Sequence, residues 1–336
     1  MQNSPLFSIL IPVRDAERTL PSALYSVVRQ SERAWECWIV DDGSRDASPR
    51  IAEAFAHSDP RFRVLRQAAL GIVPALNQGL AESSGRYVVR FDADDLMHHE
   101  RLALQRRALE RRADLAGVGC HVRLFPRSEL SCGLRAYESW LNSIHDAEDV
   151  RREACVECPL AHPTWCMRRE VLLRFGYRDT PGPEDYELIL RLLAAGERLA
   201  VVPRRLLLWR DGPSRLSRTD ARYAPERFTE CKADYLARTL LADRNDYVLW
   251  GYGDTGKALA RALASQGKRP SHIVELHQGR IGQRIAGAPV IHPETLGTLP
   301  PRPIVASVAG FVARSQIREA LRALGLREAR DFVVAA

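Results

Sequence analysis

The amino-acid sequence predicts an α/β protein, with a doubly wound mixed sheet followed by a second, smaller α/β unit. Three observations support this fold class. Short apolar and β-branched runs alternate with segments of helical spacing over the first 100 residues. Acidic residues follow two of the predicted strands, where ligands bind in sheets of this kind. After a polar stretch at 243–246 the alternation begins again, with a glycine-rich turn.

The first part of the chain supplies the alternating elements in order. The run Phe7–Val13 is apolar almost throughout, which is typical of a central parallel strand buried on both faces. Further strands are expected at Trp35–Val40, Phe62–Leu65 and Tyr87–Phe91. The spacing of apolar residues predicts helices at Leu20–Gln30, 48–57 and Val73–Glu82. This order predicts a largely parallel sheet with helices on both faces.

Length and charge restrict the class of protein. A chain of 336 residues is long enough for two domains. Its net charge is +7, and Lys232, Lys257 and Lys268 are the only lysines, so arginine supplies nearly all the positive charge. Guanidinium groups suit phosphate or anionic lipid, although base composition of the source genome would give the same bias. No nucleic-acid-binding module is recognised, so no nucleic-acid partner is expected.

The apolar runs and the cysteines indicate in which cellular compartment the protein is expected. No apolar run reaches membrane-spanning length, and the first residues lack the basic and apolar regions of a signal peptide. The seven cysteines are scattered, and Cys155–Cys158 is a lone CxxC without a second pair, so neither disulfides nor zinc are expected. We therefore expect a cytoplasmic protein. The basic helix 101–112 leaves peripheral contact with the inner face of the membrane as an alternative.

Three carboxylates, Asp92, Asp94 and Asp95, follow the strand Tyr87–Phe91 within four positions. So much negative charge at a strand end is costly unless a cation or several donors neutralise it. Hard oxygen ligands suit Mg²⁺ or Mn²⁺, which usually hold substrate phosphates as well. The alternative is that Asp94 and Asp95 cap a helix that begins near Leu96. The local pattern leaves both interpretations open.

Several motifs agree in order and spacing with one known family. They are the strand Ile9–Arg14, the turn Val40–Ser44, the run Gly71–Gly79, the motif Asp92-Ala93-Asp94 and the pair Glu184-Asp185. Together these motifs resemble the family 2 glycosyltransferases over roughly residues 5–220. The resemblance implies the GT-A nucleotide-sugar-binding fold for residues 1–243, with 221–243 as a helical exit. It also implies an inverting, metal-dependent transfer of a sugar from a nucleoside-diphosphate sugar, with uridine as the favoured base.

The resemblance assigns roles to particular residues in the donor site. Asp41 or Asp42 would accept a hydrogen bond from the ring N–H of the base. Asp94 would coordinate the metal, and Asp92 would reach the ribose or the metal. Further donor-binding residues are Pro12, Arg14, Asn77, Arg210 and Arg215. For Pro12 and Arg14, ordinary loop structure at a strand end is the alternative.

The acids Glu184 and Asp185 follow a Pro/Gly loop and precede an apolar helical segment. An inverting transfer needs one carboxylate to take the proton of the acceptor hydroxyl. By resemblance Asp185 is that base and Glu184 is the second choice; the alternative is two acids that complement a helix dipole. The QxxRW motif of processive synthases is absent, which favours transfer of a single sugar. The expected acceptor is a glycan or lipid-linked glycan in surface polysaccharide biosynthesis.

The last part of the chain, 244–336, is predicted to be a Rossmann-like domain. Gly251, Gly253 and Gly256 lie between a predicted strand and a predicted helix, and Glu275 follows the next strand. This is the arrangement of a dinucleotide site, which makes NAD(P) a candidate cofactor there. At this length a packing or interaction role is favoured. Two other functions stay open: a sugar-nucleotide-binding protein without catalysis, and a nicotinamide-dependent sugar-modifying enzyme. No feature predicts the oligomeric state.

Overall fold

A computed structural model describes residues 4–213 and 215–336 of the chain. Ser214, which directly precedes Arg215, lies outside the described residues. The chain divides into two compact units. The first unit comprises Met1–Val150, Leu160–Thr180 and Gly196–Thr219. The second unit comprises Arg151–Pro159, Pro181–Ala195 and Asp220–Ala336.

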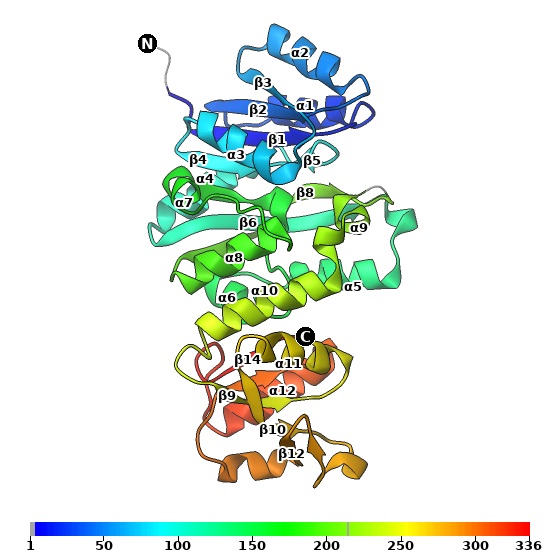
Figure 1. Cartoon of the computed structure of the whole chain (residues 1–336). Helices are drawn as coiled ribbons and strands as arrows, with labels where there is room; N and C mark the ends of the chain where they lie inside the picture. Colours follow the sequence, from blue (N-terminus) through cyan, green and yellow to red (C-terminus); the bar gives the residue numbers. More distant parts are fainter. Residues whose placement is uncertain (1–3, 214) are drawn as a thin grey trace. The chain divides into compact units, whose positions relative to one another are not determined.

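The first unit is built on an eight-stranded mixed sheet in the order β3-β2-β1-β4-β7-β6-β8-β5. The strands are β1 Phe7–Val13, β2 Trp35–Asp42, β3 Phe62–Gln67, β4 Tyr87–Arg90, β5 Leu96–Met97, β6 Leu115–Phe125, β7 Cys166–Arg168 and β8 Arg198–Arg210. The helices are α1 Leu20–Val28, α2 Ser48–Ser58, α3 Ile72–Glu82, α4 Arg101–Arg111, α5 Cys132–Leu141, α7 Arg169–Phe175 and α9 Leu216–Thr219. Helix α6, Ala147–Glu153, crosses from the first unit into the second after Val150. Figure 1 shows β3, β2, β1 and β4 in sheet order.

Strands β1 to β4 pair in parallel, so their carboxyl ends meet at one edge of the sheet. The parallel register places Val13 beside Asp41, which brings the end of β1 to the acidic turn after β2. β7 reverses the direction, pairing antiparallel with both β4 and β6. Every residue of β2 is buried, as expected for a central strand covered on both faces. The predicted mixed α/β sheet is therefore confirmed.

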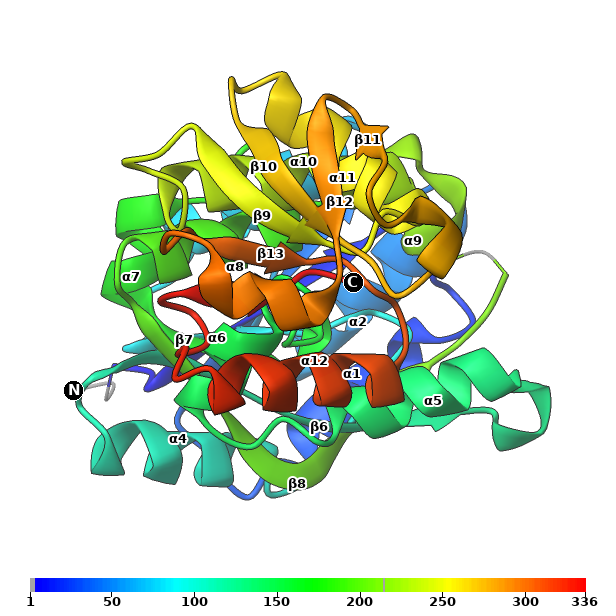
Figure 2. The same ribbon diagram turned by 90° about the horizontal axis from the view of Figure 1, so that it is seen from below.

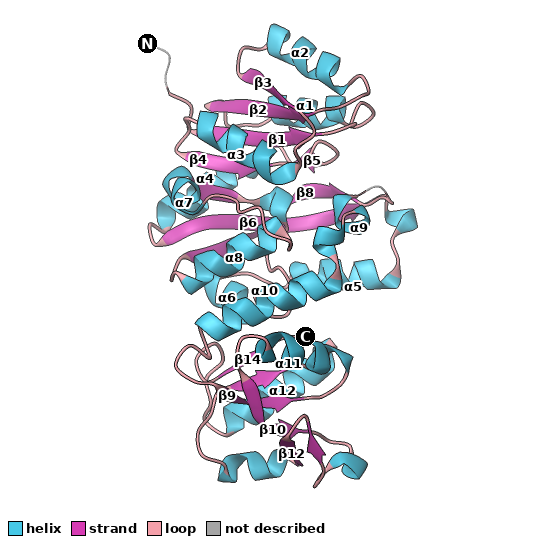
Figure 3. Cartoon of the chain, in the orientation of Figure 1, coloured by secondary structure: helices cyan, strands magenta, loops and turns pink. Residues whose placement is uncertain are grey.

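The second unit holds a six-stranded sheet in the order β11-β12-β10-β9-β13-β14. Its strands are β9 Asp246–Trp250, β10 Arg269–Val274, β11 Arg284–Ile285, β12 Ala288–Ile291, β13 Ile304–Ala306 and β14 Phe332–Val334. Its helices are α8 Glu184–Ala194, α10 Pro225–Arg238, α11 Asp254–Ala264 and α12 Phe311–Ala323. All neighbouring strands are parallel except β11 and β12, and Figure 2 shows β9, β10 and β12 side by side. Figure 3 shows the alternation of strands and helices in this unit.

The predicted helix start near Leu96 is wrong. Leu96 and Met97 form the short strand β5, which pairs antiparallel with Leu208 and Leu207 of β8. Helix α4 begins only at Arg101, with Glu100 at its N-cap. Asp94 and Asp95 therefore do not cap a helix, because the residues that follow them are drawn into the sheet by a partner strand far along the chain.

Helix α4 is less uniformly basic at its surface than its sequence indicates. Arg101 is completely buried, and Arg106 lies 3.0 Å from a carboxylate oxygen of Glu32. The exposed arginines are those of its last turns, Arg107 and Arg111. Among the described residues no helix combines the length and the apolar character needed to cross a membrane. All seven cysteines are free thiols.

Candidate active site

The carboxyl ends of β1 and β2 meet in a turn that is held by its own side chains. Asp42 is almost completely buried, and its carboxylate accepts hydrogen bonds from the backbone N–H of Leu70 (2.8 Å) and Gly71 (3.0 Å). The amide of Gln67 donates a further bond to it at 2.6 Å. Arg14, one of the predicted base-site residues, lies 3.6 Å from the second carboxylate oxygen. Both oxygens of Asp42 are therefore engaged in fixing the loop before α3.

Asp41, the neighbour of Asp42, is engaged more lightly. Its Oδ1 accepts one hydrogen bond, from the backbone N–H of Ser44 at 3.2 Å, and the side chain is equally buried. Gly43, which follows Asp42 in this turn, has a φ of +72°, a conformation that glycine adopts without strain. Pro12 of β1 is half-buried beside this strand, paired in register with Val40. The structure thus brings Pro12, Arg14, Asp41 and Asp42 to one edge of the first sheet.

The loop after β1 is cross-bonded to the turn after β2, a feature that the sequence motifs did not reveal. Ser44 Oγ accepts a hydrogen bond from the backbone N–H of Asp15 at 3.0 Å. Asp15 in return accepts one from the backbone N–H of Arg45 at 2.7 Å. Ser48 Oγ accepts another from the backbone N–H of Ala16 at 2.8 Å. These bonds join two loops about 30 residues apart in sequence and make a fixed rim beside Asp41.

The three carboxylates after β4 come together. Oxygen atoms of Asp92, Asp94 and Asp95 all lie within 4.8 Å of one another, the separation expected of groups that share one metal ion. Burial, with the adjacent charge of Asp92, raises the pKa of Asp94 to about 6. Burial also raises the pKa of Asp95 well above its ordinary value, with Asp92 and Asp94 adding to the effect. The unmet charge of this cluster favours a cation.

Two arginines, Arg90 and Arg210, contact this cluster directly. Arg90 of β4 pairs with Asp92. The backbone N–H of Arg210, at the end of β8, donates to Asp95 Oδ1 at 2.7 Å, and its side-chain Nε donates to the carbonyl oxygen of Asp94 at 2.7 Å. Asp95 Oδ2 is buried and has no hydrogen-bond partner. Arg210 therefore fixes the acidic loop to β8, while carboxylate oxygens remain for a divalent ion.

Arg215, the second predicted diphosphate contact, is held beside the same strand end. Its guanidinium lies over the Trp209 ring, 4.3 Å from the centroid, and 3.6 Å from Asp211. Its charge lowers the pKa of Asp94, opposing the effect of burial. Asp211 also pairs with Arg218 at 2.7 Å. Sequence reasoning missed Asp211, because an isolated acid in an Arg-rich stretch carries no motif.

Asn77 on α3 is used by the protein itself. Its amide nitrogen donates to the carbonyl oxygen of Tyr177 at 2.9 Å, and its amide oxygen accepts from the Tyr177 backbone N–H at 3.1 Å. This reciprocal pair fixes the loop after α7 against α3. The Tyr177 hydroxyl in turn lies 3.0 Å from Nε2 of His162. Asn77 and Tyr177 lie 100 positions apart, and no sequence motif connects them.

The two candidate general bases, Glu184 and Asp185, begin helix α8 in the second unit, as the sequence indicated. Glu184 is almost completely buried, and its Oε2 accepts a hydrogen bond from the Tyr223 hydroxyl at 2.7 Å. Asp185 is only partly buried, and its Oδ1 accepts the backbone N–H of Tyr186 at 2.7 Å. The two acids are thus held differently, although they are adjacent in sequence.

The glycine-rich turn after β9 is also tightly built. A Cβ at Gly251 would lie 2.4 Å from a Val308 methyl group, and one at Gly256 only 2.2 Å from the carbonyl oxygen of Gly251. A Cβ at Gly253 would meet nothing within 4 Å. Glu275 Oε1 accepts the backbone N–H of Tyr252 at 2.8 Å and lies 3.2 Å from Arg280. The carboxylate expected to bind a ribose is therefore bonded to the loop itself.

Comparison with known proteins identifies the first part of the chain. The family model described as Glycosyl transferase family 2 matches residues 8–175. An uncharacterized glycosyltransferase of Haemophilus influenzae is 27% identical over 62% of this chain and 67% of its own length. The putative glycosyltransferase EpsE of Bacillus subtilis is 29% identical over 59% of this chain and 70% of its own length.

Two solved structures resemble this one in fold. TarS of S. aureus, in complex with UDP-GlcNAc, matches with a TM-score of 0.57 and 18% identity over 76% of this chain and 71% of its own. The mannosyltransferase PcManGT from Pyrobaculum calidifontis, in complex with GDP-Man and Mn²⁺, matches with a TM-score of 0.53 and 18% identity over 79% of this chain and 70% of its own. The expectation of a GT-A fold is therefore confirmed.

Proposed function

This chain belongs to glycosyl transferase family 2, and we propose that it transfers a single sugar from a nucleoside-diphosphate sugar, with inversion, in a metal-dependent reaction. That it is a glycosyltransferase follows from the family and from its relatives. One observation supports the metal-dependent form of the reaction. Carboxylate oxygens of Asp92, Asp94 and Asp95 at the end of β4 lie within 4.8 Å of one another, and burial raises the pKa of both Asp94 and Asp95.

In this proposal Asp92 and Asp94 hold Mg²⁺ or Mn²⁺. Such an ion, when bound, offsets the negative charge that develops on the leaving nucleoside diphosphate. The donor set fits a hard cation, because it consists of carboxylate oxygens, and the buried Oδ2 of adjacent Asp95 has no hydrogen-bond partner. The Mn²⁺ bound in the mannosyltransferase structure supports this choice of metal class.

The donor base would lie at the carboxyl ends of β1 and β2, bordered by Pro12 and Arg14. We assign the acceptor of the base N–H to Asp41, because both oxygens of Asp42 are already engaged by Gln67, Leu70 and Gly71. A uridine base is supported by the UDP and UDP-GlcNAc complexes of TarS, with guanosine as the alternative. Carboxylates accept ring N–H groups of either base, so Asp41 serves both.

The remaining predicted donor residues divide into two kinds. We assign Arg215 to the diphosphate, an assignment supported by the effect of its charge on nearby Asp94. Arg210 and Asn77 shape the site indirectly, through the backbone atoms of Asp94 and Tyr177. Substitution of either would therefore alter the geometry of a loop as well as remove a side chain.

Asp185 is the proposed general base, which takes the proton of the acceptor hydroxyl as it attacks the anomeric carbon. Its partial exposure leaves it accessible, whereas the carboxylate of Glu184 is buried and bonded to Tyr223. Exchange of Asp185 for Asn should abolish transfer while leaving donor binding nearly intact. Loss of donor affinity in that variant would remove Asp185 from this role.

A thermal-shift screen of nucleoside diphosphates tests the proposed donor class. The full chain is heated with UDP, GDP or NAD⁺, each with and without Mn²⁺. We expect UDP to raise Tm only when Mn²⁺ is present, because ligand binding to the folded state shifts unfolding by mass action. Stabilisation by NAD⁺ alone would contradict the proposal and favour a nicotinamide-dependent enzyme.

The acceptor is proposed to be a glycan or lipid-linked glycan of surface polysaccharide biosynthesis, on the cytoplasmic side of the membrane. The chain itself offers a modest basic surface for contact with anionic lipid, formed by Arg107 and Arg111 of α4. The relative EpsE is named a putative glycosyltransferase, and its name specifies no acceptor. Transfer assays with candidate glycan and lipid-linked acceptors test this part of the proposal.

We further propose that residues 244–336 form a Rossmann-like domain with a packing role. The strand order β12-β10-β9-β13-β14 has the 3-2-1-4-5 pattern of such folds. Glu275 is bonded to its own loop, which disfavours NAD(P) as a ligand there. The boundary near residue 243 is proposed from the start of β9 at Asp246, although the second unit also takes in earlier segments.

A further inference from the structure

Helix α8 is anchored next to the proposed base by a bond to a distant segment. The Tyr186 hydroxyl donates to the carbonyl oxygen of Ala154 at 2.6 Å, and the Tyr186 side chain is completely buried. Its ring also lies 5.5 Å from that of Phe228 on α10. Because Tyr186 directly follows Asp185 and its N–H binds Asp185 Oδ1, this anchor fixes the first turn of α8.

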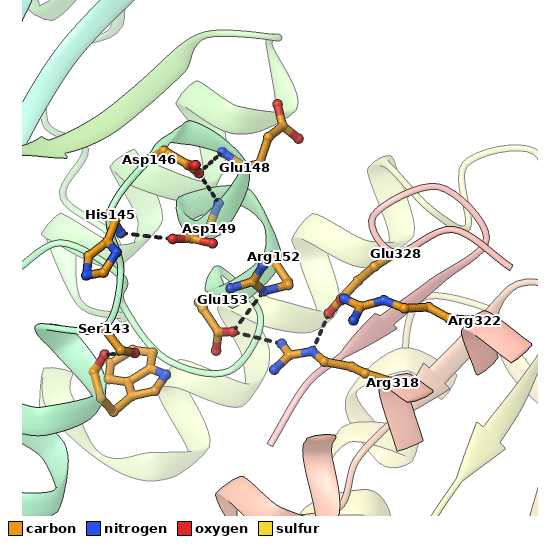
Figure 4. Close-up of polar contacts among 11 residues, drawn as sticks. Ser143, His145, Asp146, Glu148, Asp149, Arg152, Glu153, Arg318, Arg322 and Glu328 are labelled. Atoms are coloured by element: carbon orange, nitrogen blue, oxygen red, sulfur yellow. Dashed lines mark hydrogen bonds and ion pairs between the residues drawn. The ribbon is translucent and has the colours of Figure 1, made fainter. Parts of the chain in front are cut away.

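Glu153, the residue before Ala154, forms an ion pair with Arg318 of helix α12. Arg318 of α12 lies between two carboxylates, 2.9 Å from Glu153 and 2.8 Å from Glu328 (Figure 4). All three side chains are at most about a tenth exposed. The ion pair with Arg318 joins Glu153 to α12, and Glu153 also pairs with Arg152 at 3.3 Å. Loss of a charged partner from a buried carboxylate is disfavoured.

The same segment is fixed a second time on its other side. Lys232 of α10 donates through Nζ to the carbonyl oxygen of Val156 at 2.8 Å, and lies 3.4 Å from the carbonyl oxygen of Ala335 after β14. Cys155 packs in the hydrophobic core of this unit, which includes Leu236 and Leu249. Residues 153–156 are therefore joined to α10, to α12 and to the end of the second sheet.

We propose that the C-terminal part of the chain is a positioning element for catalysis, in which Arg318 and Tyr186 act as positioning residues for Asp185. The connected contacts run from Arg318 to Glu153, through the backbone to Ala154, and on to Tyr186. This inference rests on the proposed role of Asp185. It gives the appended sheet a function that needs no second nucleotide.

The kinetic consequence follows from the geometry that proton transfer requires. A general base must lie within hydrogen-bond reach of the acceptor hydroxyl, and a shift of about 1 Å can cost roughly 100-fold in rate. The donor site, by contrast, is proposed at the ends of β1, β2 and β4, and none of the residues assigned to it lies on α8. A disturbed anchor should therefore lower kcat and leave the donor KM unchanged.

The test is a double-mutant cycle on the full chain, with Tyr186→Phe, Arg318→Gln and the double variant. We expect each single change to lower kcat about tenfold at saturating donor, with donor KM unchanged. Because both residues act through one connected network, the double variant should lose little more than the worse single variant. Arg318→Lys, which keeps the charge, should recover part of the lost kcat.

Two control variants separate positioning from general destabilisation. Tyr247 is buried in β9 and its hydroxyl has no hydrogen-bond partner, so Tyr247→Phe should leave kcat unchanged. Arg302 pairs with Asp246 elsewhere in the second unit, so Arg302→Gln removes an ion pair outside the network. Melting curves of all variants establish that assays are made on folded protein. If Arg318→Gln is unfolded, Tyr186→Phe carries the test, because it removes only the hydroxyl that bonds Ala154.

The outcomes distinguish this inference from the proposed function. Unchanged kcat in folded Tyr186→Phe would overturn the positioning role, as would a rise in donor KM or full additivity in the cycle. If Asp185→Asn keeps normal activity, the proposed base is wrong and the positioning role falls with it. If Asp185→Asn is inactive and the anchor variants are normal, only the positioning role fails.

Discussion

The carboxyl edges of the two sheets offer a direct comparison. Both are edges of parallel strands, and each carries a motif associated with nucleotide binding. In the first sheet, Asp92, Asp94 and Asp95 lie together with raised pKa values for Asp94 and Asp95, and one buried oxygen lacks a partner. In the second sheet, Glu275 accepts a hydrogen bond from the backbone N–H of Tyr252 and forms an ion pair with Arg280. Unmet charge marks a ligand site better than a glycine pattern does.

The largest expected effect comes from removing a carboxylate of the first sheet. Asp94→Asn should lower transfer by about 1,000-fold, since metal stabilisation of the leaving group contributes several kcal/mol. The same change should raise Tm of the metal-free protein, because it removes a charge that burial disfavours. Activity assays and melting curves without metal check both results. A metal-free variant that is less stable than the natural chain would contradict the charge account.

A change in the second sheet should affect stability instead of binding. A Cβ at Gly256 would lie 2.2 Å from the carbonyl oxygen of Gly251, so Gly256→Ala must displace backbone and should cost about 1–3 kcal/mol of unfolding free energy. Denaturant unfolding measures this cost. Gly253→Ala is the matched control, because its Cβ meets nothing and its φ is −76°. Equal effects of the two changes would show that the turn is not closely packed.

The pH dependence of metal binding sharpens the contrast between the edges. The pKa of Asp94 is raised to about 6, and a ligand must be deprotonated to bind metal. Affinity for Mn²⁺ should therefore fall roughly tenfold for each pH unit below about 6. For the metal-free protein the sign is opposite: the folded state binds the proton more tightly than the unfolded state. Its free energy of unfolding should thus decrease as pH rises from the ordinary aspartate pKa to about 6.

Isothermal titration with Mn²⁺ at several pH values, paired with denaturant unfolding of the metal-free protein, measures both trends. The Asp94→Asn variant is the control, since the part of each trend that arises from Asp94 should disappear in it. Mn²⁺ affinity that stays flat from about pH 5 to about pH 7 would be inconsistent with a carboxylate of raised pKa in the site.

The smallest effect is expected at Glu275. Glu275→Gln keeps an oxygen that can accept the Tyr252 N–H and loses the ion pair with the partly exposed Arg280. The cost should be about 0–1 kcal/mol in unfolding free energy, with kcat and donor KM unchanged. Denaturant unfolding measures the change in stability, and steady-state kinetics measures kcat and donor KM. A clear loss of transfer activity would assign the second sheet a ligand that takes part in the reaction.

Much of the fold could be predicted from sequence because its elements are locally encoded. The apolar run Phe7–Val13 forms β1 with the expected bounds, and the helix after the Pro/Gly loop begins at Glu184 as predicted. The strand β5 could not be predicted in this way. Its two residues pair with Leu207 and Leu208 of β8, more than 100 positions away, and nothing in Leu96–Met97 itself encodes that partner.

The candidate site was predictable in its chemistry and less so in its division of roles. The sequence motifs identify Asp41, Asp42, Asp92 and Asp94, which the structure brings to one edge of the first sheet. They do not reveal that both oxygens of Asp42 accept hydrogen bonds from the loop 67–71. Hydrogen-bond partners of this kind depend on how distant loops pack, and that information is not present in a local pattern.

The central claim is that nucleotide binds at the metal edge of the first sheet and nowhere on the second. Calorimetric titration of UDP into the full chain with Mn²⁺, repeated for Asp94→Asn and Glu275→Gln, tests it most directly. We predict one binding site that requires Mn²⁺, disappears in Asp94→Asn and is unchanged in Glu275→Gln. Binding that survives in Asp94→Asn, needs no metal and is lost in Glu275→Gln would contradict the claim.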